Sequence, residues 1–181
     1  MRNKRFLIVA VLIIQVSSIL GQQMDLYPAS ISPGSYVITA NAGSLPGNPT
    51  TNNTSQSVRY KWPFNNWQMC NITVESSTTI PSGITVTVKA TGNDGGDGFL
   101  LQHRYGTGDV TVTVTSTPLN LITGIWSTNA STYYGAVKQI TRPLVQNITI
   151  SDFSKLHPGI YPVTLIYVMQ WHAVVHILQR R

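Results

Sequence analysis

The chain has 181 residues, and its 12 lysines and arginines against 6 aspartates and glutamates give a formal net charge of +6. Three of the cations stand at the extreme N-terminus and most of the others are scattered singly, so no basic stripe of the kind that binds nucleic acid is formed. The few acidic residues offer no carboxylate pair for hydrolysis, and no nucleophile or phosphate-binding motif accompanies them. We therefore expect no nucleic-acid partner, no enzyme activity, no catalytic residue and no cofactor.

The N-terminus has the pattern of a secretory signal peptide. Arg2, Lys4 and Arg5 form a positive region, and residues 6–14 form an unbroken apolar run. This run is shorter than the roughly 20 residues that a membrane-spanning helix needs. The sequence therefore predicts a signal peptide over residues 1–21, cleaved after Gly21, with an uncleaved anchor as the alternative. The mature protein is then expected to be exported, either secreted or, if the source is bacterial, carried through the periplasm to the cell surface.

The rest of the chain is expected to form one β-sandwich domain. Short runs rich in Val, Ile, Thr and Tyr alternate apolar and polar residues and are separated by Gly, Pro, Asn, Asp and Ser, which is typical of strands and turns. Strands are predicted at residues 35–40, 57–62, 68–75, 84–89, 99–104, 110–115, 119–126, 146–151 and 159–171. The favoured fold is all-β, an antiparallel Ig-like β-sandwich over residues 22–171, with a barrel as the alternative.

Cys70 is the only cysteine, so the domain has no intramolecular disulfide. It alternates with Ile72 and Val74 along a predicted strand, which places it on the apolar face of that strand. We expect Cys70 to be buried, and the alternative is a reactive or intermolecular thiol.

An aromatic cluster occupies the end of the strand predicted at residues 57–62 and the connection that follows it. Tyr60 and Trp62 share a strand face and are expected in the core. Phe64 and Trp67 lie in the connection and are predicted to be exposed. Because the apolar faces of sugars stack on aromatic rings, Phe64 and Trp67 form a candidate ligand platform, with a glycan as the candidate partner.

Two motifs contain residue types that bind metals. Asp94 and Asp97 lie in the glycine-rich segment 92–98 and carry the oxygen ligands that calcium prefers, but the composition is that of a hairpin turn. His172 and His176 are four residues apart, without an acidic residue or cysteine beside them. No metal site is predicted.

The predicted strand at residues 159–171 is apolar on both faces. Alternation places Tyr161, Leu165 and Tyr167 on one face, and Ile166 and Val168 on the other. Such a strand is expected to be central in its sheet or covered. Residues 172–181 are predicted to be a tail outside the core.

The segment PGIYPVTLIYVMQW, ending at Trp171, resembles the C-terminal strand of chaperone-usher pilus (fimbrial) subunits, which opens with Gly-x-Tyr or Gly-x-Phe and alternates to an aromatic residue. The resemblance implies an Ig-like sandwich that lacks one strand. Its open groove is filled first by a periplasmic chaperone and then, at an usher, by the N-terminal extension of the next subunit. It also implies that the acceptor groove is lined by Gly159, Tyr161, Val163, Leu165, Tyr167 and Met169.

The function expected from this resemblance is that of a structural or adhesive subunit of a surface fibre assembled by β-strand complementation. Its partners would be other copies or related fibre subunits, together with the chaperone and the usher. The alternative is a stand-alone secreted binding module, carbohydrate-binding in particular, whose last strand closes its own sheet.

Overall fold

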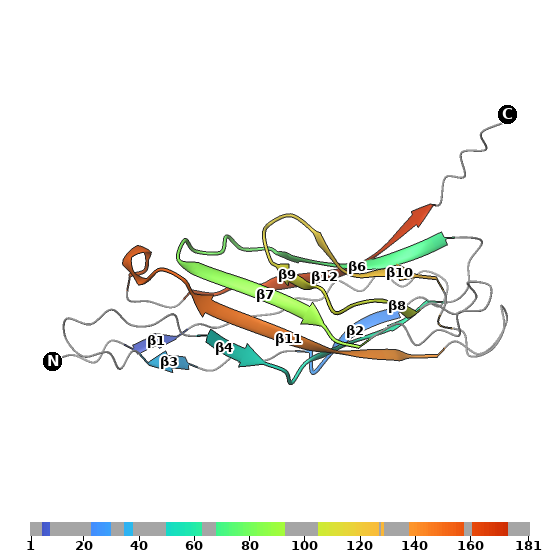
Figure 1. Cartoon of the computed structure of the whole chain (residues 1–181), viewed down its shortest axis with the longest axis horizontal. Coiled ribbons are helices and arrows are strands. Elements are labelled where there is room, and N and C mark those ends of the chain that lie inside the picture. The colour runs from blue at the N-terminus through green and yellow to red at the C-terminus, as the bar shows by residue number, and fades with distance from the viewer. Residues whose placement is uncertain are drawn as a thin grey trace, which may run out of the picture.

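The structure, a computed structural model, describes residues 5–7, 23–29, 35–37, 50–62, 68–92, 105–126, 128, 138–157 and 161–173; for residues 5–7, 35–37, 68 and 171–173 the backbone alone is described. Within these ranges the chain forms strands and one short 3-10 helix, η1 (Phe153–Lys155). The strands pair antiparallel, and the two larger sheets pack face to face (Figure 1). This confirms the predicted all-β antiparallel sandwich. No helix in the described ranges is long and apolar enough to cross a membrane.

The larger sheet has six strands. Its order is β2 (Gln23–Tyr27), β5 (Ser57–Lys61), β11 (Ile140–Ile150), β7 (Ile84–Ala90) and β9 (Thr111–Thr113), and β4 (Thr50–Asn53) also pairs with β11. The first residues of β11 pair with β5, and its later residues lie between β4 and β7. Pro143 is the last β11 residue paired with β5, and it is exposed where β11 leaves that partner. A proline is tolerated there because its missing N–H interrupts no continuous ladder.

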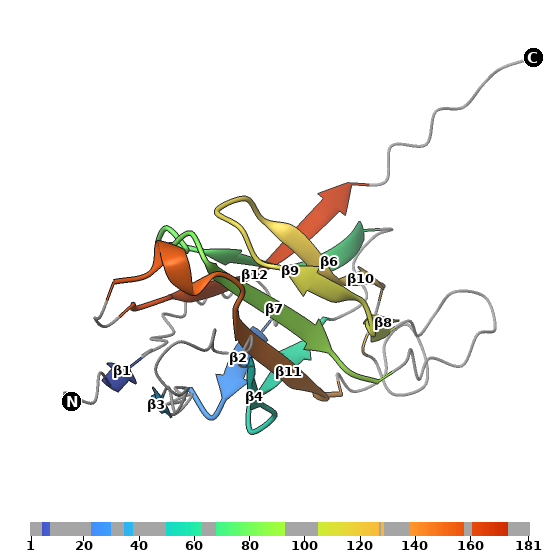
Figure 2. The same ribbon diagram turned by 60° about the vertical axis from the view of Figure 1, so that its left-hand side comes forward.

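The smaller sheet has four strands in the order β12 (Leu165–Ala173), β6 (Gln68–Ser76), β10 (Leu119–Ile125) and β8 (Tyr105–Thr107). Figure 2 shows it lying behind the sheet that contains β7 and β11. A separate antiparallel ladder joins β1 (Arg5–Leu7) to β3 (Ser35–Val37).

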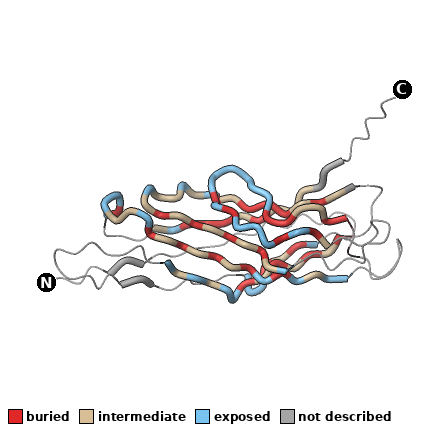
Figure 3. Tube along the Cα trace, in the orientation of Figure 1, coloured by how far each residue is buried: buried red, intermediate tan, exposed pale blue. Residues whose placement is uncertain are grey.

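One hydrophobic core lies between the two larger sheets. Burial alternates strictly along β7 and along the second half of β11, as expected for strands with one face inward and one outward (Figure 3). The inward residues of both sheets form one continuous cluster. The largest fully buried side chains include Trp62, Tyr60 and Tyr167.

One side of the sandwich is closed by the backbone itself. After β9, the Val114 N–H donates to Val86 O in the six-stranded sheet at 2.9 Å. The next residue, Thr115, accepts a hydrogen bond from the Ser76 N–H of the four-stranded sheet at 2.8 Å. The chain therefore crosses from one sheet to the other at residues 114–115, and the two sheets are hydrogen-bonded together at this point.

Several strands differ from the predicted boundaries. β11 begins at Ile140, six residues before the predicted start. Its first part was not predicted because Thr141 and Arg142 are polar, although the Arg142 side chain is buried in the structure. β2 and β4 were not predicted, since the first has only two inward apolar residues and the second is polar throughout. β8 lies just after the predicted strand at residues 99–104, which falls outside the described residues.

Candidate strand-addition edge

The C-terminal strand β12 lies at the edge of the four-stranded sheet. All nine of its residues pair with β6, from Leu165 opposite Ser76 to Ala173 opposite Gln68. No strand among the described residues pairs with its other side. The expectation was that a strand with two apolar faces would be central or covered. The central position is wrong for the described chain, and a cover over the outward face stays a prediction. Periodicity fixes which side chains share a face, but it does not fix the neighbours of the strand.

The backbone groups of alternate β12 residues point toward this open side. The Ser77 N–H donates to Thr164 O at 3.0 Å, so Thr164 directs its carbonyl toward β6. In an antiparallel ladder, successive residues direct their N–H and C=O groups to opposite sides. Leu165, Tyr167 and Met169 therefore present their backbone donors and acceptors to the open side of β12.

The predicted groove residues direct their side chains into the core. Val163 is 1% exposed, Leu165 5% and Tyr167 1%, while Tyr161 and Met169 pack against the core with partial exposure. Gly159 lies outside the described residues. The structure thus places the described members of the predicted row in one line between the sheets, and their assignment to an acceptor groove stays a prediction.

β12 also carries few of the residue types with which natural proteins protect sheet edges. Long edge strands usually carry lysines or other charged residues, or prolines, and these residues prevent pairing with another chain. From Leu165 to Trp171, β12 has no Lys, Arg, Asp, Glu or Pro, and its outward residues Ile166 and Val168 are apolar and half-buried.

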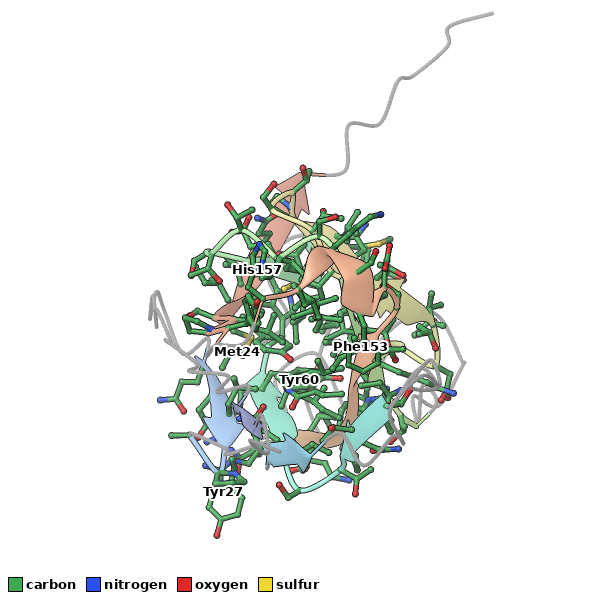
Figure 4. The ribbon with its side chains drawn as sticks, turned by 90° about the vertical axis from the view of Figure 1, so that its left-hand side faces the viewer. Met24, Tyr27, Tyr60, Phe153 and His157 are labelled. Atoms are coloured by element: carbon green, nitrogen blue, oxygen red, sulfur yellow. The ribbon has the colours of Figure 1, made fainter. Side chains whose placement is uncertain are left out.

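The other sheet edges in the described part of the chain are shorter or carry protection. β8 and β9 have three residues each, and β2 has five. β2 also carries Asp25, which accepts a hydrogen bond from Arg59 Nε at 3.0 Å, and it is followed by Pro28. In Figure 4, Tyr27 at the end of β2 projects away from the sandwich, whereas Tyr60 lies in its interior. The nine-residue β12 is therefore the edge most open to pairing.

A buried polar chain connects β12 to the opposite sheet. Gln146 Nε2 on β11 donates to Tyr167 OH at 2.9 Å and to Gln56 Oε1 at 2.8 Å. Gln56 Nε2 donates in turn to the carbonyl of Pro28 at 2.9 Å. All three side chains are buried, and burial raises the pKa of the Tyr167 phenol. The network thus fixes one position of β12 relative to β11 and to the end of β2.

The sequence analysis did not single out this network. A signal for it exists, because Gln146 stands between Leu144 and Ile148 in the inward positions of β11. A polar residue in an inward row indicates a buried partner, since an unsatisfied amide in the core is costly. The identity of that partner depends on which strands cross, and sequence periodicity does not supply it.

The other predicted residues fall partly inside the described chain. Tyr60 and Trp62 are buried in the core, and so is Cys70, which confirms all three predictions.

Phe64 and Trp67 lie outside the described residues, as do Asp94, Asp97 and His176. β12 runs to Ala173, so the first two residues of the predicted tail, His172 and Ala173, belong to the strand backbone. The described residues contain no group of three or more His, Cys, Asp or Glu that could hold a metal ion.

Neither the family models nor the curated proteins with which the sequence was compared match this chain. The functional argument therefore depends on the geometry of β12 and of the sheets beside it.

Proposed function

We propose that the protein is a structural or adhesive subunit of a surface fibre, exported through its N-terminal signal peptide and assembled by β-strand complementation. The acceptor is the open side of β12, and the sandwich is of the Ig-like type. The partner strand comes from another copy or a related subunit, after a periplasmic chaperone and an usher have handled the exported chain.

The observation that carries this proposal is the open side of β12, with which no described strand pairs and which has no charged residue or proline from Leu165 to Trp171. An incoming strand would pair with the outward N–H and C=O groups of Leu165, Tyr167 and Met169. Backbone hydrogen bonds of this kind give affinity, and the alternate side chains of the added strand give specificity. The C-terminal strand of pilus subunits, which residues 158–171 resemble, has the same role.

A proline scan along β12 tests the proposal. Met169→Pro removes an N–H that points to the open side and leaves the ladder to β6 intact, while Met169→Ala shortens the same side chain and keeps the N–H. Val168→Pro removes an N–H that points to β6 and serves as the control for a broken ladder. We expect the two Met169 variants to have similar free energies of unfolding and Val168→Pro to be much less stable.

Assembly is then measured by light scattering of the purified full chain over a concentration series. We expect the wild-type chain and Met169→Ala to associate as concentration rises, and Met169→Pro to stay monomeric. If Met169→Pro associates as readily as Met169→Ala, the open side of β12 is not the assembly site. A wild-type chain that is a stable monomer at every concentration would favour the stand-alone binding module.

A further inference from the structure

A second site lies at the opposite edge of the four-stranded sheet from β12. A hollow of about 580 Å³ opens where β8 meets the start of β11, a volume in the range of small-molecule pockets. Its polar and aromatic lining comprises Thr91, Tyr105, Lys138, Gln139, Thr141 and Arg142. β8 and β12 are the two ends of their sheet, so this hollow is distinct from the strand-addition edge.

Buried groups hold the floor of the hollow in place. Tyr60 is fully buried, and its hydroxyl donates to the carbonyl of Tyr105. Arg142, also buried, donates from Nη2 to Gly106 O at 2.6 Å and from Nε to Tyr60 OH at 3.3 Å. β5 and β11 thereby fix the backbone that carries the Tyr105 ring, so only the side-chain torsions of Tyr105 have to be ordered when a ligand packs on the ring.

The exposed part of the lining combines a cation, a ring and neutral polar groups. Lys138 Nζ stands 6.0 Å from the centre of the Tyr105 ring, and the residue is exposed. Gln139 and Thr141 are exposed beside it and supply an amide and a hydroxyl. The described lining contains no Asp or Glu, so the charge of this described lining is positive.

We propose that this hollow binds an acidic saccharide of the uronic-acid type. The apolar C–H face of the sugar packs on the Tyr105 ring, its carboxylate pairs with Lys138 Nζ, and its hydroxyls exchange hydrogen bonds with Gln139 and Thr141. A phosphate ligand would require several converging cations or a helix N-terminus, and the described lining presents a single exposed lysine. The proposal is independent of strand addition.

The test uses isothermal titration calorimetry on the purified full chain with two probes, trigalacturonate and its fully methyl-esterified form. The two probes share the same sugar rings, and each negatively charged carboxylate of the first is a neutral methyl ester in the second. We expect trigalacturonate to bind at least about tenfold more tightly than the ester, because a charge-assisted bond to Lys138 is lost in the ester.

Three variants locate the binding. Lys138→Gln should weaken trigalacturonate binding about tenfold and abolish the preference over the ester. Tyr105→Leu keeps the backbone carbonyl that binds Tyr60 and should weaken both probes equally. Lys155→Gln makes the same charge change in an exposed residue on η1 and should bind like wild type. Circular dichroism verifies that each variant is folded.

Failure to bind trigalacturonate would overturn the proposal, as would equal affinity for the two probes. A loss of affinity in Lys155→Gln as large as in Lys138→Gln would show non-specific charge attraction and would also overturn it. None of these outcomes depends on whether the chain assembles through β12.

Discussion

Replacing Tyr167 with phenylalanine isolates the contribution of the buried polar chain that connects β12 to β11. The ring stays in place, so no cavity opens, and only the hydroxyl that accepts a hydrogen bond from Gln146 Nε2 at 2.9 Å is lost. One N–H of Gln146 is then left without a partner at a position where both residues are buried. An unsatisfied buried donor costs about 1–3 kcal/mol, so we expect Tyr167→Phe to lower the free energy of unfolding by about that amount. This is a large share of the roughly 5–15 kcal/mol by which a domain is stable.

The measurement is urea unfolding followed by tryptophan fluorescence, and Tyr161→Phe is the matched control. The Tyr161 hydroxyl donates to the carbonyl of His157 in an exposed setting, so water replaces the lost bond and the change should be within about 0.5 kcal/mol of wild type. The double variant Tyr167→Phe with Gln146→Leu should be more stable than the sum of the two single losses predicts, because both polar groups are removed together. If Tyr167→Phe unfolds at the same urea concentration as Tyr161→Phe, the polar chain does not hold β12, and the reasoning is refuted.

Two further predictions concern residues outside the two proposed sites. Cys70 is buried, and burial raises the pKa of its thiol. In the native chain at pH 8 the thiol should therefore react with a thiol reagent only as fast as the protein unfolds, and in denaturant it should react rapidly. Fast labelling of the native chain would show an exposed thiol and contradict this prediction. Gly83→Ala should be destabilising by more than about 1 kcal/mol relative to Gly124→Ala. Both glycines have positive φ, but a Cβ at Gly83 would lie 2.3 Å from the backbone O of Asp152, whereas a Cβ at Gly124 would meet no atom within 4 Å. Equal unfolding midpoints of the two variants would contradict the close approach at Gly83.

The sequence predicted the strands in which alternation is regular. β5, β6, β7 and β10 lie within about two residues of their expected positions, because each has an inward row of Val, Ile or aromatic residues that only a half-buried strand explains. β2 and β4 escaped prediction because they are short and mostly polar. β2 pairs with β5 and β4 pairs with β11, and in both cases the partner lies far away along the chain.

The candidate site was only partly predictable for a different reason. The inward row of β12 could be read from Leu165, Tyr167 and Met169, but the edge position of the strand follows from which strands surround β6. The inward glutamines and Arg142 are polar residues at apolar positions, and each is satisfied by a partner far away in sequence. The hollow beside Tyr105 likewise depends on the contacts that β8 makes with β5 and β11, and no local sequence pattern predicts these contacts.

The geometry of β12 separates two kinds of evolutionary constraint within the same residues. The side chains of Leu165 and Tyr167 are constrained by the core of their own domain, whereas their outward peptide groups are chemically the same in every amino acid except proline. Substitutions that repack the core therefore leave the pairing edge unchanged, provided that they avoid proline at Leu165, Tyr167 and Met169. Such an edge can keep the same partner while the sequence of the strand drifts, and it can accept a new partner without any change of its own. Divergence of this strand in sequence would then be a poor measure of divergence in what it pairs with.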